Sequence, residues 1–148
     1  MGIFPIDEIV NAADETWRDS VVAASAACQQ AMTEELYDWL NSTQRQNGQF
    51  VPAGKRDIID TKQLYNSHRV DGDDLVWSAE YADLNHDGGM VGRRYHHARP
   101  WTEYGIKGDS TDDANWQRDE AILDLPAFFE AGMERKIDAI DPNGDTDA

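Results

Sequence analysis

The feature that most constrains this chain is an apolar repeat that runs from about Asp7 to Asn41 without a proline or a glycine. Apolar residues recur there at spacings of mostly three and four, the period of one face of an α-helix. They are Val10, Ala13, Trp17, Val21, Ala24, Cys28, Ala31, Leu36 and Trp39 or Leu40. We therefore expect one unusually long helix, and its small residues (23–27) should let another backbone approach closely.

The pattern changes beyond this helix. Residues 42–57 combine glycine, proline and polar side chains and should form a loop. Residues 68–79 should form two strands joined by a turn. Leu75, Trp77 and Ala79 alternate with other side chains and so form one face of the second strand. This face could lie on the long helix. Tyr81 to His86 should be a short helix stopped by two glycines, and Met90 to Trp101 a basic connection.

The carboxyl-terminal part contains a loop and a second helix. Residues 105–116 hold two glycines and three aspartates and should be a surface loop. From Leu125 to Ile140 the three-four spacing returns, with Pro126 suited to a first turn. We expect a single α+β domain over residues 1–140, in which a small antiparallel sheet is packed by the two helices. Residues 141–148 should be a disordered acidic tail.

Charge and cysteine content exclude several classes of protein. Thirteen Lys and Arg against 29 Asp and Glu give a net charge of −16, which disfavours tight binding to nucleic-acid phosphates. No apolar run is long enough to cross a membrane. The lone Cys28 cannot form an intrachain disulfide, and no secretory leader is evident, so a reducing cytoplasm is the expected setting.

No convincing catalytic site emerges from the residues. A glycine-rich phosphate loop and a GxSxG turn are both missing, and Cys28 lies within the helical apolar pattern, where a buried inert thiol is expected. A divalent metal site is the weaker alternative, and its donors would come from His68, His86, His96, His97, Asp83 and Asp87. Residues 83–88 also resemble the start of a calcium loop, but Arg94 stands where that loop needs a glutamate.

One basic patch interrupts the acidic sequence. Arg93, Arg94 and Arg99 are the only charged residues between Gly89 and Thr102. They could pair with the protein's own carboxylates, or they could dock onto an acidic partner or a neighbouring copy. We take these arginines and Trp101 as the candidate interface with another subunit or a partner. Trp17, Trp77 and Trp101 are candidate core or interface anchors, with burial in the subunit's own core as the default.

Three short segments follow one another in an informative order. They are DTKQLYNS at residues 60–67, YADLNHDG at 81–88 and ARPW at 98–101. Together they resemble the head-tail joining, or tail-completion, family of long-tailed bacteriophages. Members of that family carry D-T-G-x-L-x-x-S, a hairpin, Y-A-x-x-V-H/E-x-G, A-R-P-F/W and a closing helix. The resemblance covers roughly residues 8–140.

The chain departs from the family pattern at three places. Lys62 replaces the usual glycine, so the backbone there should avoid a conformation that only glycine adopts. Asn85 replaces an aliphatic residue. The acidic segment at about 102–125 looks like an insertion, because the closing helix of the family follows the A-R-P segment directly.

The resemblance implies a virion structural protein of the phage neck without an active site or a cofactor. Such subunits form rings, commonly of six, that join head and tail or terminate the tail and let DNA pass without specific binding. The implied partners are other copies of the chain, a connector or stopper protein and the tail tube protein, in the virion and, during assembly, in the host cytoplasm. The alternatives are a stand-alone acidic protein that binds a basic partner and, less favoured, a metal-dependent hydrolase.

Overall fold

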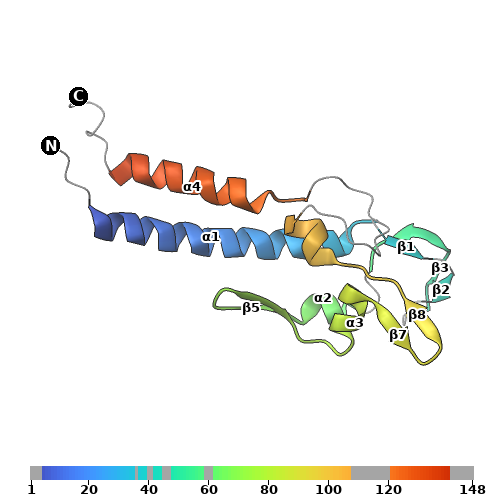
Figure 1. Ribbon diagram of the computed structural model, residues 1–148. Helices are drawn as coiled ribbons and strands as arrows, with labels where there is room; N and C mark the ends of the chain where they lie inside the picture. Colours follow the sequence, from blue (N-terminus) through green and yellow to red (C-terminus); the bar gives the residue numbers. More distant parts are fainter. Residues whose placement is uncertain are drawn as a thin grey trace.

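The computed structural model describes residues 5–35, 37–39, 42–44, 48–58, 62–107 and 121–140. In chain order the elements are α1 (Ile6–Thr33), β1 (Tyr37–Trp39), β2 (Thr43–Gln44), β3 (Phe50–Val51), β4 (Gly54–Arg56), α2 (Gln63–Asn66), β5 (His68–Asp71), β6 (Asp74–Trp77), α3 (Ala82–Asp87), β7 (Gly89–Val91), β8 (Arg94–His96), the π-helical turn η1 (Glu103–Lys107) and α4 (Leu125–Ile140). The predicted α+β class is confirmed. Two long helices lie side by side, and most of the short strand pairs gather toward one end of α1 (Figure 1).

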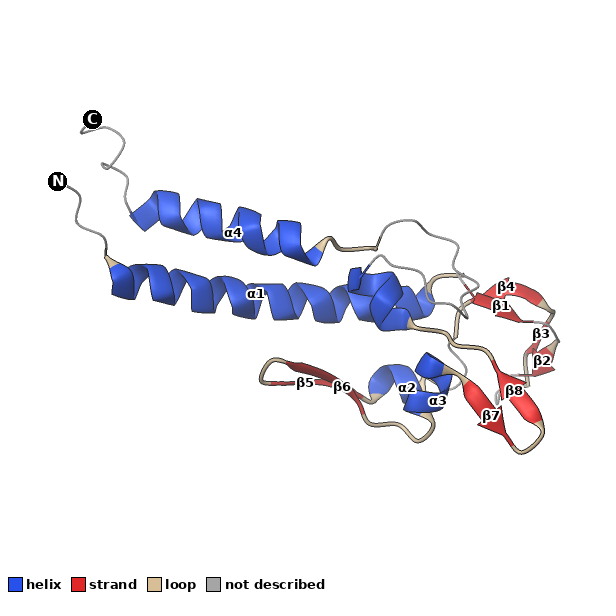
Figure 2. Ribbon diagram, in the orientation of Figure 1, coloured by secondary structure: helices blue, strands red, loops and turns tan. Residues whose placement is uncertain are grey.

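The strands in the described ranges form four antiparallel pairs, β1–β4, β2–β3, β5–β6 and β7–β8. Figure 2 shows them in red, and the β7–β8 pair projects from the body. Two predictions for connecting segments were wrong. Residues 42–57 contain β2, β3 and β4, and Met90 to Trp101 begins with the β7–β8 hairpin, which turns at Gly92 (φ 62°).

Helix α1 is as unbroken as predicted but ends at Thr33, about eight residues early. Glu34 takes extended backbone angles (φ −83°, ψ 150°), and Tyr37 folds back on the helix end. The Tyr37 hydroxyl donates a 2.8 Å hydrogen bond to the Ala31 carbonyl, and its ring meets Tyr104 edge-on. The apolar spacing continued past the true end because Tyr37 and Trp39 alternate in a strand that pairs with β4.

The core lies against the carboxyl-terminal third of α1. Its members are all at most 2% exposed: Cys28, Ala31, Met32, Tyr37, Trp101 and Tyr104. Tyr37 and Trp101 are the largest side chains in this cluster, and each contributes roughly 2–3 kcal/mol by leaving water. The carboxyl-terminal part of α1 therefore carries the cluster of most deeply buried large side chains.

Helix α4 packs on a face of α1 made of small residues. Ala12, Thr16 and Ser20 are buried there, and both hydroxyls bond to carbonyls of their own helix, so that neither is left unsatisfied. A Cβ added at Gly132 would lie 2.8 Å from the Thr16 methyl group, so this glycine sets the helix separation. Lys136 adds a 2.9 Å ion pair to Asp19.

The turn η1 approaches the backbone of α1 closely. A Cβ built at Gly105 would lie 2.9 Å from the Cα of Cys28 and 3.1 Å from the carbonyl carbon of Ala27. The predicted close approach at the small-residue run is thus confirmed at its carboxyl-terminal end. The neighbouring amide of Ile122 donates to the Tyr104 carbonyl, which ties the start of the α4 segment to η1.

The hairpin β5–β6 lies along α1, as its alternating pattern predicted. Its strands pair from His68 with Trp77 to Asp71 with Asp74. At the base of the hairpin the Trp77 indole donates to Gln29, and at its turn Asp73 accepts from Trp17. The hairpin therefore covers α1 from Gln29 back to Trp17 and stops there.

The short helix α3 and the closing helix α4 agree with their predictions. The predicted acidic insertion, at about 102–125, is described at residues 102–107, which enter η1, and at 121–125, which lead into α4. Residues 108–120 and the predicted tail at 141–148 lie outside the described residues. None of the helices in the described part of the chain combines the length and the hydrophobicity needed to cross a membrane.

Candidate functional site

The four predicted interface residues do not share one surface. Arg93 is exposed at the turn of the β7–β8 hairpin, and the side chain of Arg94 lies outside what the structure describes. Arg99 is half-buried and donates to the His97 carbonyl at 3.4 Å. Trp101 is 2% exposed in the core, so its ring presents no surface to a partner, and the default expectation of burial holds for it.

Arg99 belongs to a cluster around Trp39. The guanidinium carbon of Arg99 lies 4.0 Å from the centre of the Trp39 ring, and that of Arg56 lies 4.1 Å from it. A cation this close to an indole ring is attracted by the electrons of its face. These contacts of Arg99 lie within its own chain, but they are with a ring and a carbonyl and not with the carboxylate that the sequence suggested.

The second and third signature segments meet at Trp101. Its ring contacts Trp77 (5.6 Å between centres) and His86 (4.7 Å), both edge-on. The amide of Arg99 donates to the Asn85 carbonyl at 2.9 Å, which joins the third segment to the second. Leu64 of the first segment packs against the same core cluster. We call this meeting place the signature junction.

Two signature segments begin with an unusual backbone angle. Lys62 (φ 66°) and Tyr81 (φ 67°) are the two described residues other than glycine with positive φ, and each precedes a short helix. The sequence predicted that Lys62 avoids a conformation restricted to glycine. Its left-handed helical conformation is one that glycine favours and other residues adopt at a cost of about 1 kcal/mol. Position 62 therefore has the left-handed backbone that glycine favours.

The histidines have structural partners rather than metal geometry. The His68 ring stacks on Trp77 at 4.2 Å and bonds to the Val76 carbonyl and to the Ser25 hydroxyl. His86 bonds to Asp87 and to the Thr102 hydroxyl, both at 2.6 Å. Within the described ranges, no three His, Cys, Asp or Glu side chains are grouped so that they could hold a metal ion.

The segment that resembles a calcium loop is helical. Residues 83–87 belong to α3, which ends before Gly88. In a helix alternate side chains point about 200° apart, so the oxygens of Asp83, Asn85 and Asp87 do not converge on one point. The segment instead positions His86 against Trp101.

Cys28 is an inert thiol, as the sequence predicted. Cys28 lies on α1 and is fully buried where η1 packs against the helix. Burial raises the pKa of its thiol from 9.0 to about 12. A thiol that holds its proton this strongly is a poor nucleophile.

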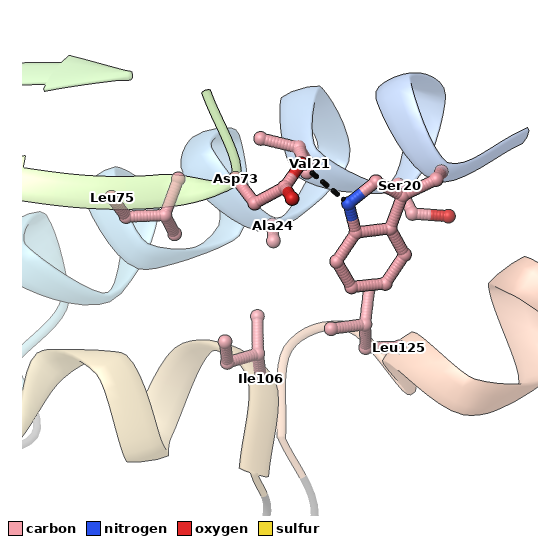
Figure 3. Close-up of a pocket in the computed structure, with 8 residues that line it drawn as sticks. Ser20, Val21, Ala24, Asp73, Leu75, Ile106 and Leu125 are labelled. Atoms are coloured by element: carbon pink, nitrogen blue, oxygen red, sulfur yellow. Dashed lines mark hydrogen bonds between the residues drawn. The ribbon is translucent and has the colours of Figure 1, made fainter. Parts of the chain in front are cut away.

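An apolar pocket of about 210 Å³ lies where the hairpin, η1 and the start of α4 meet α1 (Figure 3). Val21, Leu75, Ile106 and Leu125 converge on it. The dashed line in Figure 3 is the 2.7 Å hydrogen bond from the Trp17 indole to Asp73, which lies at its rim. This bond marks the point where the cover of α1 ends.

Beyond that point the same apolar face of α1 is exposed. Ile6 is 62% exposed, Val10 51% and Trp17 42%, and they continue the three-four spacing of the buried Val21, Ala24 and Cys28. We call Ile6, Val10, Ala13 and Trp17 the bare stripe, of which Ala13 is half-buried and Trp17 also meets the Phe129 ring of α4 edge-on at 6.1 Å. The sequence alone does not reveal this stripe, because a periodic pattern shows which face of a helix is apolar and not how far along the helix that face is covered.

The charge around the bare stripe is acidic. Asp7, Glu8, Asp14 and Glu15 are all exposed, and the first base in the chain is Arg18. Residues 1–44 contain eight acids and one base, a composition that by itself is typical of a solvated helix face. The structure adds that the acids flank an exposed apolar surface, as at sites of association.

Comparison with known proteins identifies no relative. No protein-family model matches the chain, and neither a curated protein nor a solved structure does.

Proposed function

We propose that this protein is a structural subunit of the neck of a tailed bacteriophage, where it forms a ring, of six copies in the family pattern, that joins head and tail or terminates the tail. The observation that carries the proposal is the signature junction. Segments 81–88 and 98–101 of the family pattern meet at Trp101, and Leu64 of segment 60–67 packs against the same core cluster.

The backbone at Lys62 supports the same proposal. Family members carry glycine at the corresponding position, and the left-handed angle of Lys62 is the conformation that glycine favours. Lys62 therefore departs from the family pattern in its side chain, whereas its backbone conformation suits the glycine of that pattern.

The net charge of −16 suits a ring through which DNA passes. Carboxylates that line the channel would repel the phosphates and keep the genome from adhering to the wall. A neutral or positive channel in a ring structure would contradict this part of the proposal.

The experiment is electron cryomicroscopy of particles that contain the protein. The proposal predicts ring density coaxial with the tail tube that accommodates α1 packed against α4. Contact with the last layer of the tube would identify a tail terminator, and contact with portal-side proteins a connector. Particles with a complete neck in which no density fits this chain would contradict the proposal.

The exposed acidic face of α1 favours one other function, a stand-alone protein that binds a basic partner. That function predicts a chain absent from particles and monomeric or dimeric in solution. A metal-dependent hydrolase has no such observation in its favour among the described residues. Substitution of the exposed Asp83 by Asn should leave a ring's assembly unchanged, whereas it should disable a site that uses this carboxylate.

A further inference from the structure

The bare stripe has a counterpart on the β7–β8 hairpin. Met90 and Tyr95 lie directly opposite each other across the two strands and are 61% and 52% exposed, and Val91 is 47% exposed. No other helix or strand in the described ranges runs closely alongside this hairpin. A two-stranded hairpin alone is marginally stable in water, so its apolar side chains would gain from a partner surface.

The hairpin is nevertheless fixed at its base. A Cβ at Gly88 would lie 2.7 Å from both the Ala98 amide nitrogen and the His96 carbonyl oxygen, so the two ends of the hairpin cross in close contact. The bond from the Arg99 amide to the Asn85 carbonyl anchors the exit strand to α3. We call residues 89–96 the arm, since they project from a rigid base (Figure 2).

The arm and the bare stripe carry opposite charge. From Gly88 to Thr102 the chain has three arginines and no carboxylate, and Arg93 is exposed at the arm's tip. From Met1 to Trp17 it has four carboxylates and no lysine or arginine. Opposite charges around two apolar surfaces steer the surfaces together and fix their orientation.

We propose that the arm of one copy docks on the bare stripe of a second copy of this chain. One chain cannot make this contact with itself, because α1 alone is about 42 Å long and the arm lies at the end opposite the bare stripe (Figure 1). Each copy offers one arm and one stripe, so the contact is head-to-tail, the kind that closes into rings. This contact would join neighbouring copies within the proposed ring. It rests on the proposed function only for the closing of these contacts into a ring.

A pair of variants, each with one added cysteine, tests the contact. Chains with Val10→Cys are mixed with chains with Tyr95→Cys and oxidised, and a disulfide dimer of one chain of each kind is expected. The native Cys28 is fully buried and does not compete. Val22→Cys replaces Val10→Cys as the matched control, because Val22 is 67% exposed on the same helix and lies about a third of a turn around it. Equal mixed-dimer yields from positions 10 and 22 would overturn the proposal.

Association of charged variants gives the second test. Val10→Asp and Met90→Asp each place a charge on an exposed position, so both should fold and both should weaken self-association at least tenfold. A mixture of the two retains one intact arm and one intact stripe, and it should form dimers but nothing larger. A native chain that stays monomeric at millimolar concentration, or a mixture that stays monomeric while the native chain assembles, would overturn the proposal.

These results separate the contact from the neck function. Mixed disulfide dimers of a chain that is absent from particles would support the contact and contradict the neck function. Ring density in which the arm does not touch α1 of the next copy would support the neck function and contradict the contact.

Discussion

The two halves of α1 share one apolar pattern and differ in what covers it. From Val21 to Ala31 the apolar face is closed by the hairpin β5–β6, by η1 and by the signature junction. From Ile6 to Trp17 the same face is more exposed, although α4 packs on the adjacent small-residue face and its Phe129 meets the Trp17 ring. The hairpin's cover of this face ends at the bond between Trp17 and Asp73, and under the proposed contact a second copy covers the next stretch.

The covered half should contribute most of the free energy of unfolding. The largest loss is expected from a substitution at Trp101. Trp101→Ala removes the ring at the centre of the signature junction, and we expect a loss of about 3–5 kcal/mol in the free energy of unfolding. Denaturant titration followed by circular dichroism measures it. Trp17→Ala, which alters the exposed tryptophan at the end of the cover, should cost less than half as much. Similar losses of unfolding free energy in Trp101→Ala and Trp17→Ala would contradict the difference between the covered and the bare half.

A matched pair of valines compares the halves on one helix. Val21 is 8% exposed and Val10 is 51% exposed. Val21→Ala should cost about 1–2 kcal/mol of unfolding free energy in dilute protein, and Val10→Ala should change it by less than about 0.5 kcal/mol. Thermal and urea unfolding of both variants at low protein concentration would decide. Losses that agree within error would show that the bare half is covered within one chain.

The pH dependence of stability should trace to Cys28 in the covered half. Its pKa is raised from 9.0 to about 12 by burial, so the folded chain keeps a proton that the unfolded chain releases. The contribution is complete below pH 9 and is lost as the pH rises from 9 towards 12. Between pH 9 and 11 the native chain should lose roughly 1 kcal/mol per pH unit more than Cys28→Ala does. If the free energies of unfolding of the native chain and of Cys28→Ala changed in parallel with pH, Cys28 would not be a buried neutral thiol.

The smallest expected effect concerns Lys62, which has a left-handed backbone. Lys62→Gly relieves the left-handed backbone at φ 66° and should raise the free energy of unfolding by about 0.5 kcal/mol. Lys62→Ala keeps the strain and should show no gain, and Gln63→Gly, within α2, should lose stability. If Lys62→Ala stabilised the chain as much as Lys62→Gly, the lysine side chain and not the backbone would be the cause.

Most helices and the four-residue strands could be predicted from the sequence, whereas the strands of two or three residues were not. The start of α1, the hairpin β5–β6, α3 and α4 follow from periodicity, turn residues and glycine stops. Strands of two or three residues, such as β2 and β4, are too short for a period to show. The β7–β8 hairpin did carry a signal, since Gly92 between Val91 and Arg93 matches the Gly72 turn of the first hairpin.

The candidate site was predicted in part. Burial of Cys28 and of Trp101 as the default followed from their places in apolar and signature patterns. The position of Arg99 over Trp39 depends on a tertiary fold that the sequence does not encode locally. The bare stripe was hidden in the α1 repeat, because equal spacing gives equal apolar faces whether or not a partner covers them.

Amide hydrogen exchange across protein concentration tests the central claim most directly. We predict that residues 21–33 are protected at every concentration, because their cover belongs to the same chain. Residues 6–17 and the arm should gain protection together as the concentration rises, because each is covered by another copy. Protection of residues 6–17 that does not change with concentration, or that rises while the arm stays unchanged, would contradict the account.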